Sequence, residues 1–266
     1  MTSHYGLGYV TEKDLKSDHF FSEKTEYDVE KDKSSNVSIL SDGVYDSNLI
    51  IKEKNRSFDK VVYESFMMDF WNNLLSLYSK ENNLKLNSSE STDIIYDFNN
   101  RNSFLVMNYC PGIALKKIPY KRNDFVNFKG NNTHKSNVLS YHIGVLNKIK
   151  ESELLLHSDY DDRHILFYHN PKKDINSLSV IDVENSKFCK KVDKILKESE
   201  NLENLLKKHF PRDENEDFYY EGYDSIDSLF SRDDVFKKTE KNFNEKFKKN
   251  GEPYVNIDIY EQDINC

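Results

Sequence analysis

The most constraining feature of the sequence is the stretch from Leu154 to Phe167, where two apolar runs enclose a polar loop that carries His157 and Asp159. A further short apolar run, Leu178–Ile181, ends directly at Asp182. Short apolar runs bounded by polar residues are typical of buried strands. The fold therefore has to accommodate two strand-like segments that each present a carboxylate.

Two carboxylates presented in this way suit phosphoryl transfer. One aspartate can orient and deprotonate an attacking hydroxyl, while the other holds Mg²⁺ on the phosphates of a nucleotide. Such a site also uses a lysine near the phosphates, which is positioned by a glutamate. The sequence upstream of Leu154 contains a candidate for each of these parts.

Three short strands are predicted within residues 25–54, and the turn between the first two, Lys31–Ser35, is polar. The predicted strands are Tyr27–Glu30, Asn36–Leu40 and Leu49–Lys52. We interpret them as a small antiparallel sheet in which Lys52 closes the third strand.

Residues 58–80 are predicted to form a helix on which Glu64 shares a face with apolar residues. These residues are Val61, Met68, Trp71 and Leu75. Burying a carboxylate without a cation is costly, so Glu64 needs a partner, and Lys52 is the natural candidate. The alternative is that Glu64 lies at the rim of the apolar face and is solvated.

Two more strands are predicted at residues 93–96 and 103–107. The second leads through Met107, Asn108 and Cys110 to a Pro-Gly pair, after which a helix is expected to start. This segment resembles the hinge that links the two lobes of protein kinases. The alternative is an ordinary strand followed by a Pro-Gly turn.

The C-terminal half is predicted to be mainly helical. Residues 138–151 have helical apolar spacing and lead directly into the loop of His157. Residues 187–209 are predicted as one charged helix or a helix pair, and residues 230–247 as another helix. Residues 80–92 and 116–137 are predicted as loops.

Composition excludes several classes of function. The net charge of −8 disfavours extensive nucleic-acid binding, although a local basic patch stays open. Three widely separated cysteines lack the spacing of a zinc site or a disulfide framework and fit a reducing, cytoplasmic setting. No apolar run is long enough to span a membrane, and the first residues lack the pattern of a signal peptide.

In the order of its motifs the chain resembles atypical members of the protein-kinase-like superfamily, namely RIO-type kinases and lipopolysaccharide core sugar kinases. The motifs that carry the resemblance are Lys52, Glu64, the segment Met107–Gly112, His157-x-Asp159 and Val180-Ile181-Asp182. The resemblance covers about residues 25–210 of the chain.

This resemblance implies an α+β, two-lobed protein-kinase-like fold, with a small antiparallel-sheet N-lobe and a mainly helical, reduced C-lobe. The expected domains are a polar N-terminal arm at residues 1–24, the N-lobe at 25–110, and the C-lobe with an acidic tail at 111–266. The region after Asp182 is short, so a full activation loop is not expected.

The resemblance also implies roles for the catalytic residues. Asp159 is expected to be the catalytic base, and Asp182 to bind Mg²⁺ that bridges the phosphates of ATP. Lys52, positioned by Glu64, is expected to neutralise phosphate charge. His157 is expected to tie the catalytic loop to the strand before Asp182.

Nucleotide contacts follow from the same resemblance. Ser34 and Ser35 are expected to replace the glycines of a phosphate-covering loop, as serine-containing loops do in RIO-type kinases. Met107 stands at the gatekeeper position. Backbone groups of Asn108 and Cys110 are expected to meet the adenine edge.

Two positions depart from ordinary protein kinases. His164 stands five residues after Asp159, where an asparagine that binds metal is usual, and it resembles the histidine of lipopolysaccharide core sugar kinases. It is a candidate metal ligand, although magnesium prefers oxygen. Asp182-Val183-Glu184 replaces Asp-Phe-Gly and resembles the Ile-Asp-Val step of RIO-type kinases.

The predicted function is ATP- and Mg²⁺-dependent transfer of the γ-phosphate to a hydroxyl of a protein Ser/Thr or of a sugar-like molecule. One alternative is a pseudokinase that binds nucleotide or partner proteins as a scaffold without turnover. The other is a metal-dependent hydrolase built from carboxylates and histidines of one loop, which are His157, Asp159, Asp161, Asp162 and His164. The hydrolase leaves the order of Lys52 and Glu64 unexplained.

Overall fold

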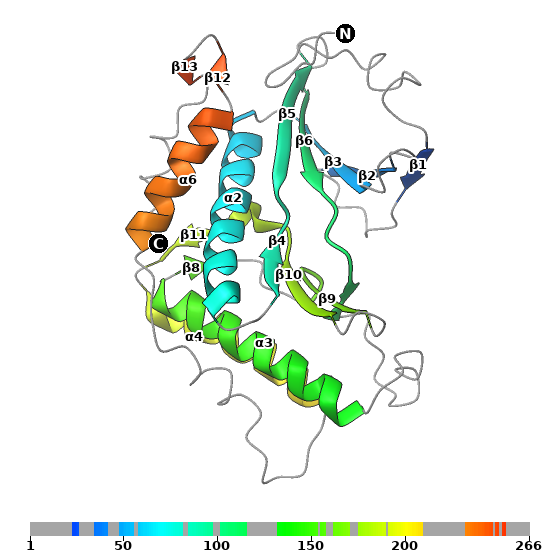
Figure 1. The fold of residues 1–266 in the computed structure, drawn as a ribbon, viewed down its shortest axis with the longest axis vertical. Helices are drawn as coiled ribbons and strands as arrows, with labels where there is room; N and C mark the ends of the chain where they lie inside the picture. The colour runs from blue at the N-terminus through cyan, green and yellow to red at the C-terminus, as the bar shows by residue number, and fades with distance from the viewer. Residues whose placement is uncertain are drawn as a thin grey trace. The chain divides into compact units, whose positions relative to one another are not determined.

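The computed structural model describes most of the chain. The described residues are 23–26, 35–41, 48–55, 58–81, 85–97, 102–115, 132–153, 155–157, 162–170, 175–189, 191–209, 232–246, 248–249 and 252–253. They form an α+β fold, as the sequence predicted (Figure 1).

The elements alternate between short strands and long helices. In chain order they are β1 (Glu23–Glu26), β2 (Ser35–Ser41), β3 (Asn48–Asn55), α2 (Phe58–Glu81), β4 (Leu86–Ser88), β5 (Ser91–Asp97), β6 (Asn102–Asn108), β7 (Ile113–Ala114), α3 (Asn132–Ser152), β8 (Leu155–Leu156), β9 (Ile165–Asn170), β10 (Ile175–Val180), the 3₁₀ turn η3 (Val183–Asn185), β11 (Lys187–Phe188), α4 (Val192–His209), α6 (Arg232–Lys246), β12 (Lys248–Lys249) and β13 (Glu252–Pro253).

The chain divides into two compact units. The first contains strands β1, β2, β3, β5 and β6, helix α2 up to Phe70, and helix α6 from Phe236 onward. The second contains α2 from Trp71, strand β4, and the elements from Cys110 to Val235. Two helices, α2 and α6, therefore contribute residues to both units.

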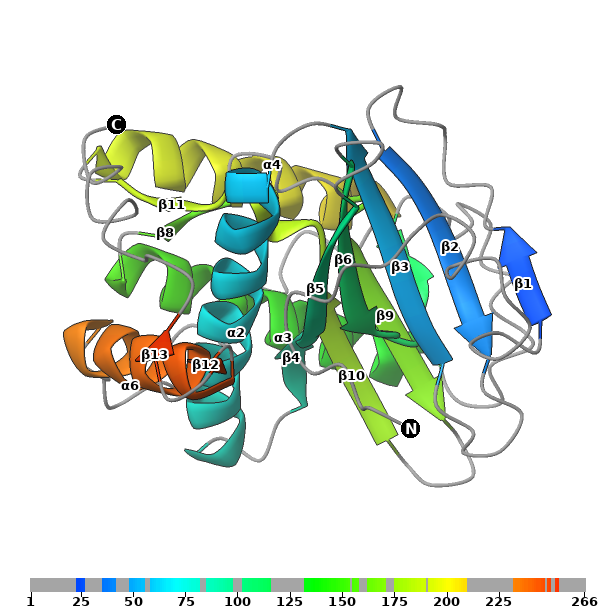
Figure 2. The ribbon, with the colours of Figure 1, turned by 90° about the horizontal axis from the view of Figure 1, so that it is seen from above.

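The first unit is built on a five-stranded antiparallel sheet in the order β1-β2-β3-β6-β5 (Figure 2). Strands β2 and β3 occupy the predicted places, with Val37 opposite Lys52. The strand expected at residues 27–30 lies outside the described residues, and β1 precedes it at Glu23–Glu26. Strand β3 is central, and β6 pairs it on its other side, with Leu105 opposite Lys52. Lys52 is thus fixed in the middle of the sheet.

Helix α2 forms over the predicted residues, and apolar side chains surround its whole circumference. A helix of this kind is stable when it is covered on several sides. Its fully buried residues include Val61, Phe66, Phe70, Trp71, Leu74, Leu75 and Tyr78. Within the first unit, α6 runs beside the N-terminal part of α2, and ring contacts join them (Figure 1).

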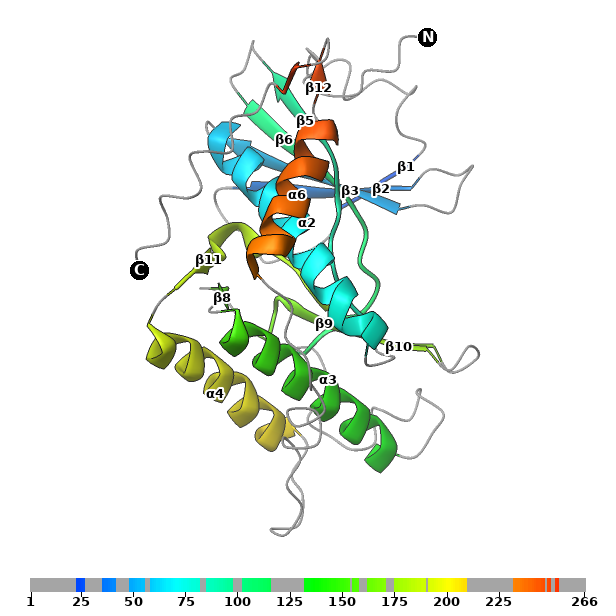
Figure 3. The same ribbon diagram turned by 60° about the vertical axis from the view of Figure 1, so that its left-hand side comes forward.

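The second unit contains a four-stranded sheet in the order β4-β10-β9-β7. Strand β10 pairs with β9 as an antiparallel hairpin and with β4 in parallel. Helices α3 and α4 contact each other (Figure 3) and are close to the predicted helices at residues 138–151 and 187–209. A second, two-stranded pairing joins β8 to β11.

Three elements of the second unit differ from expectation. Strand β11 (Lys187–Phe188) occupies the start of the segment predicted as helical, and α4 begins only at Val192. Strand β4 lies in a segment that was predicted as a loop. The prediction missed it because three residues are too few to show an alternating pattern. Strand β7 follows Gly112 where a helix start was expected. Gly112 has φ +144°, which L-residues rarely adopt, and this conformation lets the chain enter β7 and pair with β9.

None of the helices in the described part of the chain is long and apolar enough to cross a membrane.

Candidate functional site

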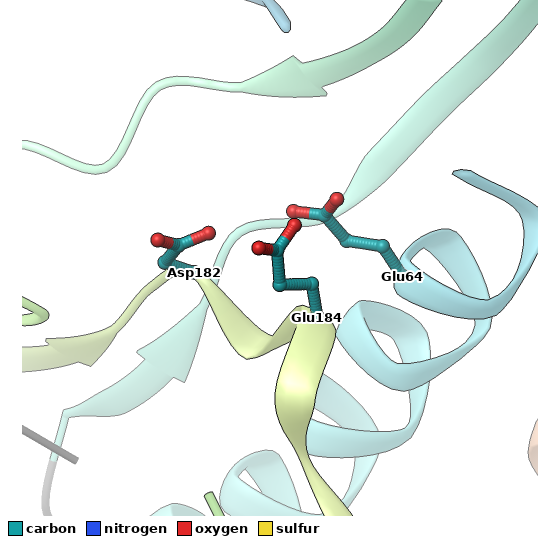
Figure 4. A group of neighbouring side chains, drawn as sticks. All are labelled: Glu64, Asp182 and Glu184. Carbon is teal, nitrogen blue, oxygen red and sulfur yellow. The ribbon is translucent and has the colours of Figure 1, made fainter. Parts of the chain in front are cut away.

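The first unit contains a buried ion pair between a strand and a helix. Lys52 Nζ on β3 lies 2.9 Å from Glu64 Oε1 on α2, and the two side chains are 9% and 0% exposed. The predicted pair therefore forms, and Glu64 is not at a solvated rim. Figure 4 shows the Glu64 carboxylate at the side of α2.

A buried ion pair of this kind is weak evidence for a stabilising role. The cost of removing two charges from water offsets much of their attraction, and apolar residues of similar size often serve stability equally well. Met, Phe and Leu side chains occupy neighbouring buried positions on the same helix. The presence of charges at Lys52 and Glu64 therefore favours a functional explanation.

In the second unit, the β9–β10 hairpin brings His164 beside Asp182. Ile165 pairs with Val180 in the hairpin, so the residues just before β9 and just after β10 are neighbours. The amide of Ile181 donates to the carbonyl oxygen of His164 over 2.9 Å. His164 Nε2 then lies 3.4 Å from Asp182 Oδ2. This distance suits an ion pair or two ligands of a shared cation.

Asp182 adopts the left-handed conformation, with φ 57° and ψ 51°, at the start of η3. Among the described residues other than glycine, it is the one with positive φ. Backbone strain at a side chain of this kind often marks a functional position. Val183 is buried, and the carboxylates of Asp182 and Glu184 project toward the same side of the chain (Figure 4).

The donor chemistry of this segment fits Mg²⁺. Carboxylate oxygens are ligands that Mg²⁺ prefers, and Asp182 and Glu184 can supply them from two positions of one short segment. His164 offers a nitrogen, which suits Mg²⁺ less well. Its place as a metal ligand stays a prediction.

His157 is fully buried and joins the end of β8 to the segment before Asp182. Its Nε2 lies 3.1 Å from the carbonyl oxygen of Ile181. Burial lowers the pKa of His157 to about 4, so the ring is neutral at pH 7 and its Nε2–H donates to this carbonyl. The predicted structural role of His157 is in accord with this contact.

The main chain at His157 is also held by helices α3 and α4. Glu198 Oε2 accepts the amide proton of His157 at 3.4 Å and lies 2.6 Å from Lys150 Nζ. Burial lowers the pKa of Lys150 to about 8, and the Glu198 carboxylate opposes this shift. The start of the loop is therefore fixed by charged groups from two helices.

The residues predicted to contact adenine lie at the end of β6 and just after it. Met107 is buried and pairs with Ile50 on β3, and its place as a gatekeeper stays a prediction. The amide of Asn108 donates to the carbonyl oxygen of Glu90 over 2.9 Å. Cys110 is buried.

Three predicted site residues receive little or no structural description. Asp159, the expected catalytic base, and Ser34 lie outside the described residues. Ser35 is the first residue of β2, where it pairs with Lys54, but its side chain is outside the description. Their roles stay predictions.

Several residues of the site were missed by sequence reasoning. Glu198 and Lys150 lie on helices far apart in the sequence, and the two helices have no local signal that pairs them. Glu184 was visible only as a departure from Asp-Phe-Gly. Glu184 follows Asp182 by two residues, with the buried Val183 between them, and this spacing is the sequence signal that marks it as a second carboxylate of the site.

No model of a protein family matches the sequence, and a search of curated proteins finds no match either. Among solved structures, the chain is similar to the Rio2 kinase–ADP/Mg²⁺–phosphoaspartate complex from Chaetomium thermophilum. The two are 13% identical, the match covers 85% of this chain and 69% of that chain, and the TM-score is 0.46.

The chain is also similar to WaaP in complex with acyl carrier protein. The identity is 12%, the match covers 85% of this chain and 90% of that chain, and the TM-score is 0.41. Because both TM-scores are below 0.5, function is inferred below from the side chains of this chain.

Proposed function

We propose that the protein is an ATP- and Mg²⁺-dependent phosphotransferase with a hydroxyl acceptor. The observation that carries this proposal is the buried ion pair of Lys52 and Glu64. It joins the centre of an antiparallel sheet to the following helix, and two buried charges in that place are poorly explained by stability alone. Lys52 neutralises phosphate charge in the proposed reaction, and Glu64 holds its ammonium group in place.

The second unit supplies the groups that handle the metal. Asp182 and Glu184 would hold Mg²⁺ through carboxylate oxygens, and the ion would supply positive charge for the transferred phosphoryl group. His157, which is neutral, ties the catalytic loop to the carbonyl of Ile181 and so fixes the chain just before Asp182. This arrangement requires no flipping glycine after Asp182.

Asp159 acts as the catalytic base in this proposal. It lies two residues after His157, whose main chain and side chain are both held by hydrogen bonds. A hydroxyl that donates to Asp159 attacks the γ-phosphorus of ATP, the bond from that phosphorus to the bridging oxygen breaks, and ADP leaves. The hydroxyl proton passes to the Asp159 carboxylate.

The acceptor is proposed to be a protein Ser/Thr hydroxyl or a sugar-like hydroxyl. The alternative is a pseudokinase, which one observation favours: His164 Nε2 lies 3.4 Å from Asp182 Oδ2. An imidazole that stays on this carboxylate competes with Mg²⁺ for the same oxygen. If this competition operates, replacement of His164 by Asn, whose side chain bears an oxygen, raises both the affinity for Mg²⁺ and the turnover rate.

The experiment that tests the proposal is a thermal shift titration with ATP and Mg²⁺. The protein is compared with the variants Lys52→Met and Asp182→Asn and with matched controls at exposed positions, Lys238→Met and Asp193→Asn. We expect stabilisation of the wild type and of both controls, and its loss in the two site variants. No shift in the wild type at millimolar nucleotide contradicts the proposal, and a shift without phosphoryl transfer favours the pseudokinase.

A further inference from the structure

Helix α6 covers α2 through aromatic side chains of the first unit. The ring of Phe66 meets Phe236 and Phe243 edge-on, with centroid distances of 5.2 and 5.6 Å. Phe70 lies against Phe236 at 6.4 Å. Phe66, Phe70 and Phe243 are fully buried. Edge-to-face aromatic contacts stabilise a packing arrangement beyond the area that they bury.

The C-terminal end of α6 adds a polar contact to the same helix. Lys246 Nζ lies 3.2 Å from Asp69 Oδ2 on α2 and 2.9 Å from Ser91 Oγ at the start of β5. It also donates to the carbonyl oxygen of Ser91. Ser91 Oγ accepts in turn from Ser65 Oγ on α2 at 2.6 Å. One ammonium group thus connects α6, α2 and β5.

These contacts lie on the side of α2 away from Glu64. At about 100° per residue, Phe66 and Phe70 point in directions roughly opposite to that of Glu64. Glu64 meets Lys52 of the sheet on one side, and α6 contacts the other side. The views in Figures 1 and 3 agree that α6 runs alongside α2. Helix α2, which carries Glu64, is therefore contacted on both sides.

We infer that α6 is a positioning element for the Lys52–Glu64 pair. Lys246, at the C-terminal end of α6, and Asp69 on α2 are the positioning residues that hold the two helices together. The inference rests on the proposed function for its effect on nucleotide binding. Sequence patterns gave α6 no role beyond that of a helix. Lys246 is the last residue of α6. Through its contacts with α2 it affects the position of the Lys52–Glu64 pair on the opposite side of that helix.

The inference predicts a dependence on pH. Burial raises the pKa of Asp69 to about 6, against the attraction of Lys246, and the nearby Glu90 carboxylate adds to the rise. The groups that face Asp69 are Lys246 from α6, Glu90 from the segment before β5, and the Ser91 hydroxyl. Below about pH 6 the carboxyl is protonated and the ion pair with Lys246 is lost. Nucleotide affinity is therefore expected to fall.

The effect of Asp69 protonation on the free energy of unfolding is opposite in sign to its effect on nucleotide affinity. Because the pKa of Asp69 is higher in the folded state than in the unfolded chain, the folded state gains protons first, and the contribution of Asp69 to stability improves as the pH falls from about 6 to 3.8. A loss of nucleotide affinity in this range thus does not reflect unfolding through Asp69. As the pH falls, nucleotide affinity is expected to decrease while the contribution of Asp69 to stability increases. These opposite changes distinguish a positioning role of Asp69 from a general structural role.

The test uses the full chain and the variants Lys246→Met, Lys246→Arg, Asp69→Asn and, as a control on the same helix, Lys241→Met at an exposed position. Two quantities are measured: hydrogen exchange of the α2 amides over residues 58–70 without nucleotide, and the dissociation constant of ADP with Mg²⁺. We expect Lys246→Met to accelerate exchange and weaken ADP binding by about tenfold, the effect of losing a hydrogen bond between charged groups. Lys246→Arg restores both, and Lys241→Met matches the wild type.

The outcomes separate this inference from the proposed function. If the wild type binds no ADP, the proposed function fails, and the exchange rates still decide whether α6 fixes α2. Wild-type exchange in both Lys246→Met and Asp69→Asn overturns the inference. An equal fall of ADP affinity below pH 6 in the wild type and in Asp69→Asn also overturns it, because that fall then comes from another group. If Lys246→Met does not fold, Asp69→Asn provides both measurements.

Discussion

The buried ion pair of Lys52 and Glu64 makes a prediction about stability that differs from its predicted effect on nucleotide binding. Replacing Lys52 by Met leaves the Glu64 carboxylate fully buried without its cation. Removing one partner of a buried ion pair costs roughly 3–5 kcal/mol. Replacing both, as Lys52→Met with Glu64→Leu, removes both desolvation costs and returns the free energy of unfolding to within about 1 kcal/mol of the wild type, or above it.

The free energy of unfolding is measured by urea denaturation for the wild type, the two single variants and the double variant. Lys238→Met, at an exposed position on α6, is the control and is expected to change stability by less than about 0.5 kcal/mol. We expect the double variant to be stable and yet unable to bind ATP. Two single variants that each cost less than about 1 kcal/mol refute the account of a desolvated pair.

Three further predictions concern the backbone and two titrating groups. Gly112→Ala is expected to lower the free energy of unfolding by at least about 2 kcal/mol, because φ is +144° and the new Cβ lies 3.1 Å from backbone atoms of Phe167. Thermal denaturation measures this loss, and a value below about 0.5 kcal/mol contradicts the prediction. The pKa of His157 is lowered to about 4, so the stability it contributes is present above pH 6.5 and is lost, by roughly 3 kcal/mol, as the pH falls through 4. Denaturation of His157→Gln across this range is expected to lack that loss. Asp69→Asn is expected to remove a gain of roughly 3 kcal/mol between pH 6 and 3.8, because the pKa of Asp69 is raised; an unchanged pH profile would count against a buried carboxyl.

Much of the first unit could be predicted from the sequence, because its signals are local. The helix α2 and the position of Glu64 among its apolar residues follow from residue spacing, and the need for a partner follows from the cost of a buried charge. Strand β2 has alternating apolar residues and β3 begins with a short apolar run, Leu49–Ile51, so both strands could be placed. The early position of β1 could not be predicted, because its sequence, Glu-Lys-Thr-Glu, is almost entirely polar.

The contacts that depend on tertiary packing could not be predicted. Helix α6 was expected as a helix, but its return to α2 in the first unit follows from rings that meet across more than half of the chain. Lys150 and Glu198 also meet only because α3 packs against α4. In contrast, the approach of His164 to Asp182 follows from the register of one short hairpin. Once β9 and β10 are placed, that contact is fixed.

The measurement that tests phosphoryl transfer most directly uses ATP labelled in the γ-phosphate, with Mg²⁺ and the full chain. Transfer of label to the protein itself, to water, and to a panel of protein and sugar hydroxyls is followed in the wild type, in Asp159→Asn and in Asp182→Asn, with Asp193→Asn as control. The account predicts transfer by the wild type and the control that both site variants lose. Tight binding of ATP and Mg²⁺ without transfer of label to any acceptor or to water would contradict it and would leave a nucleotide-binding pseudokinase.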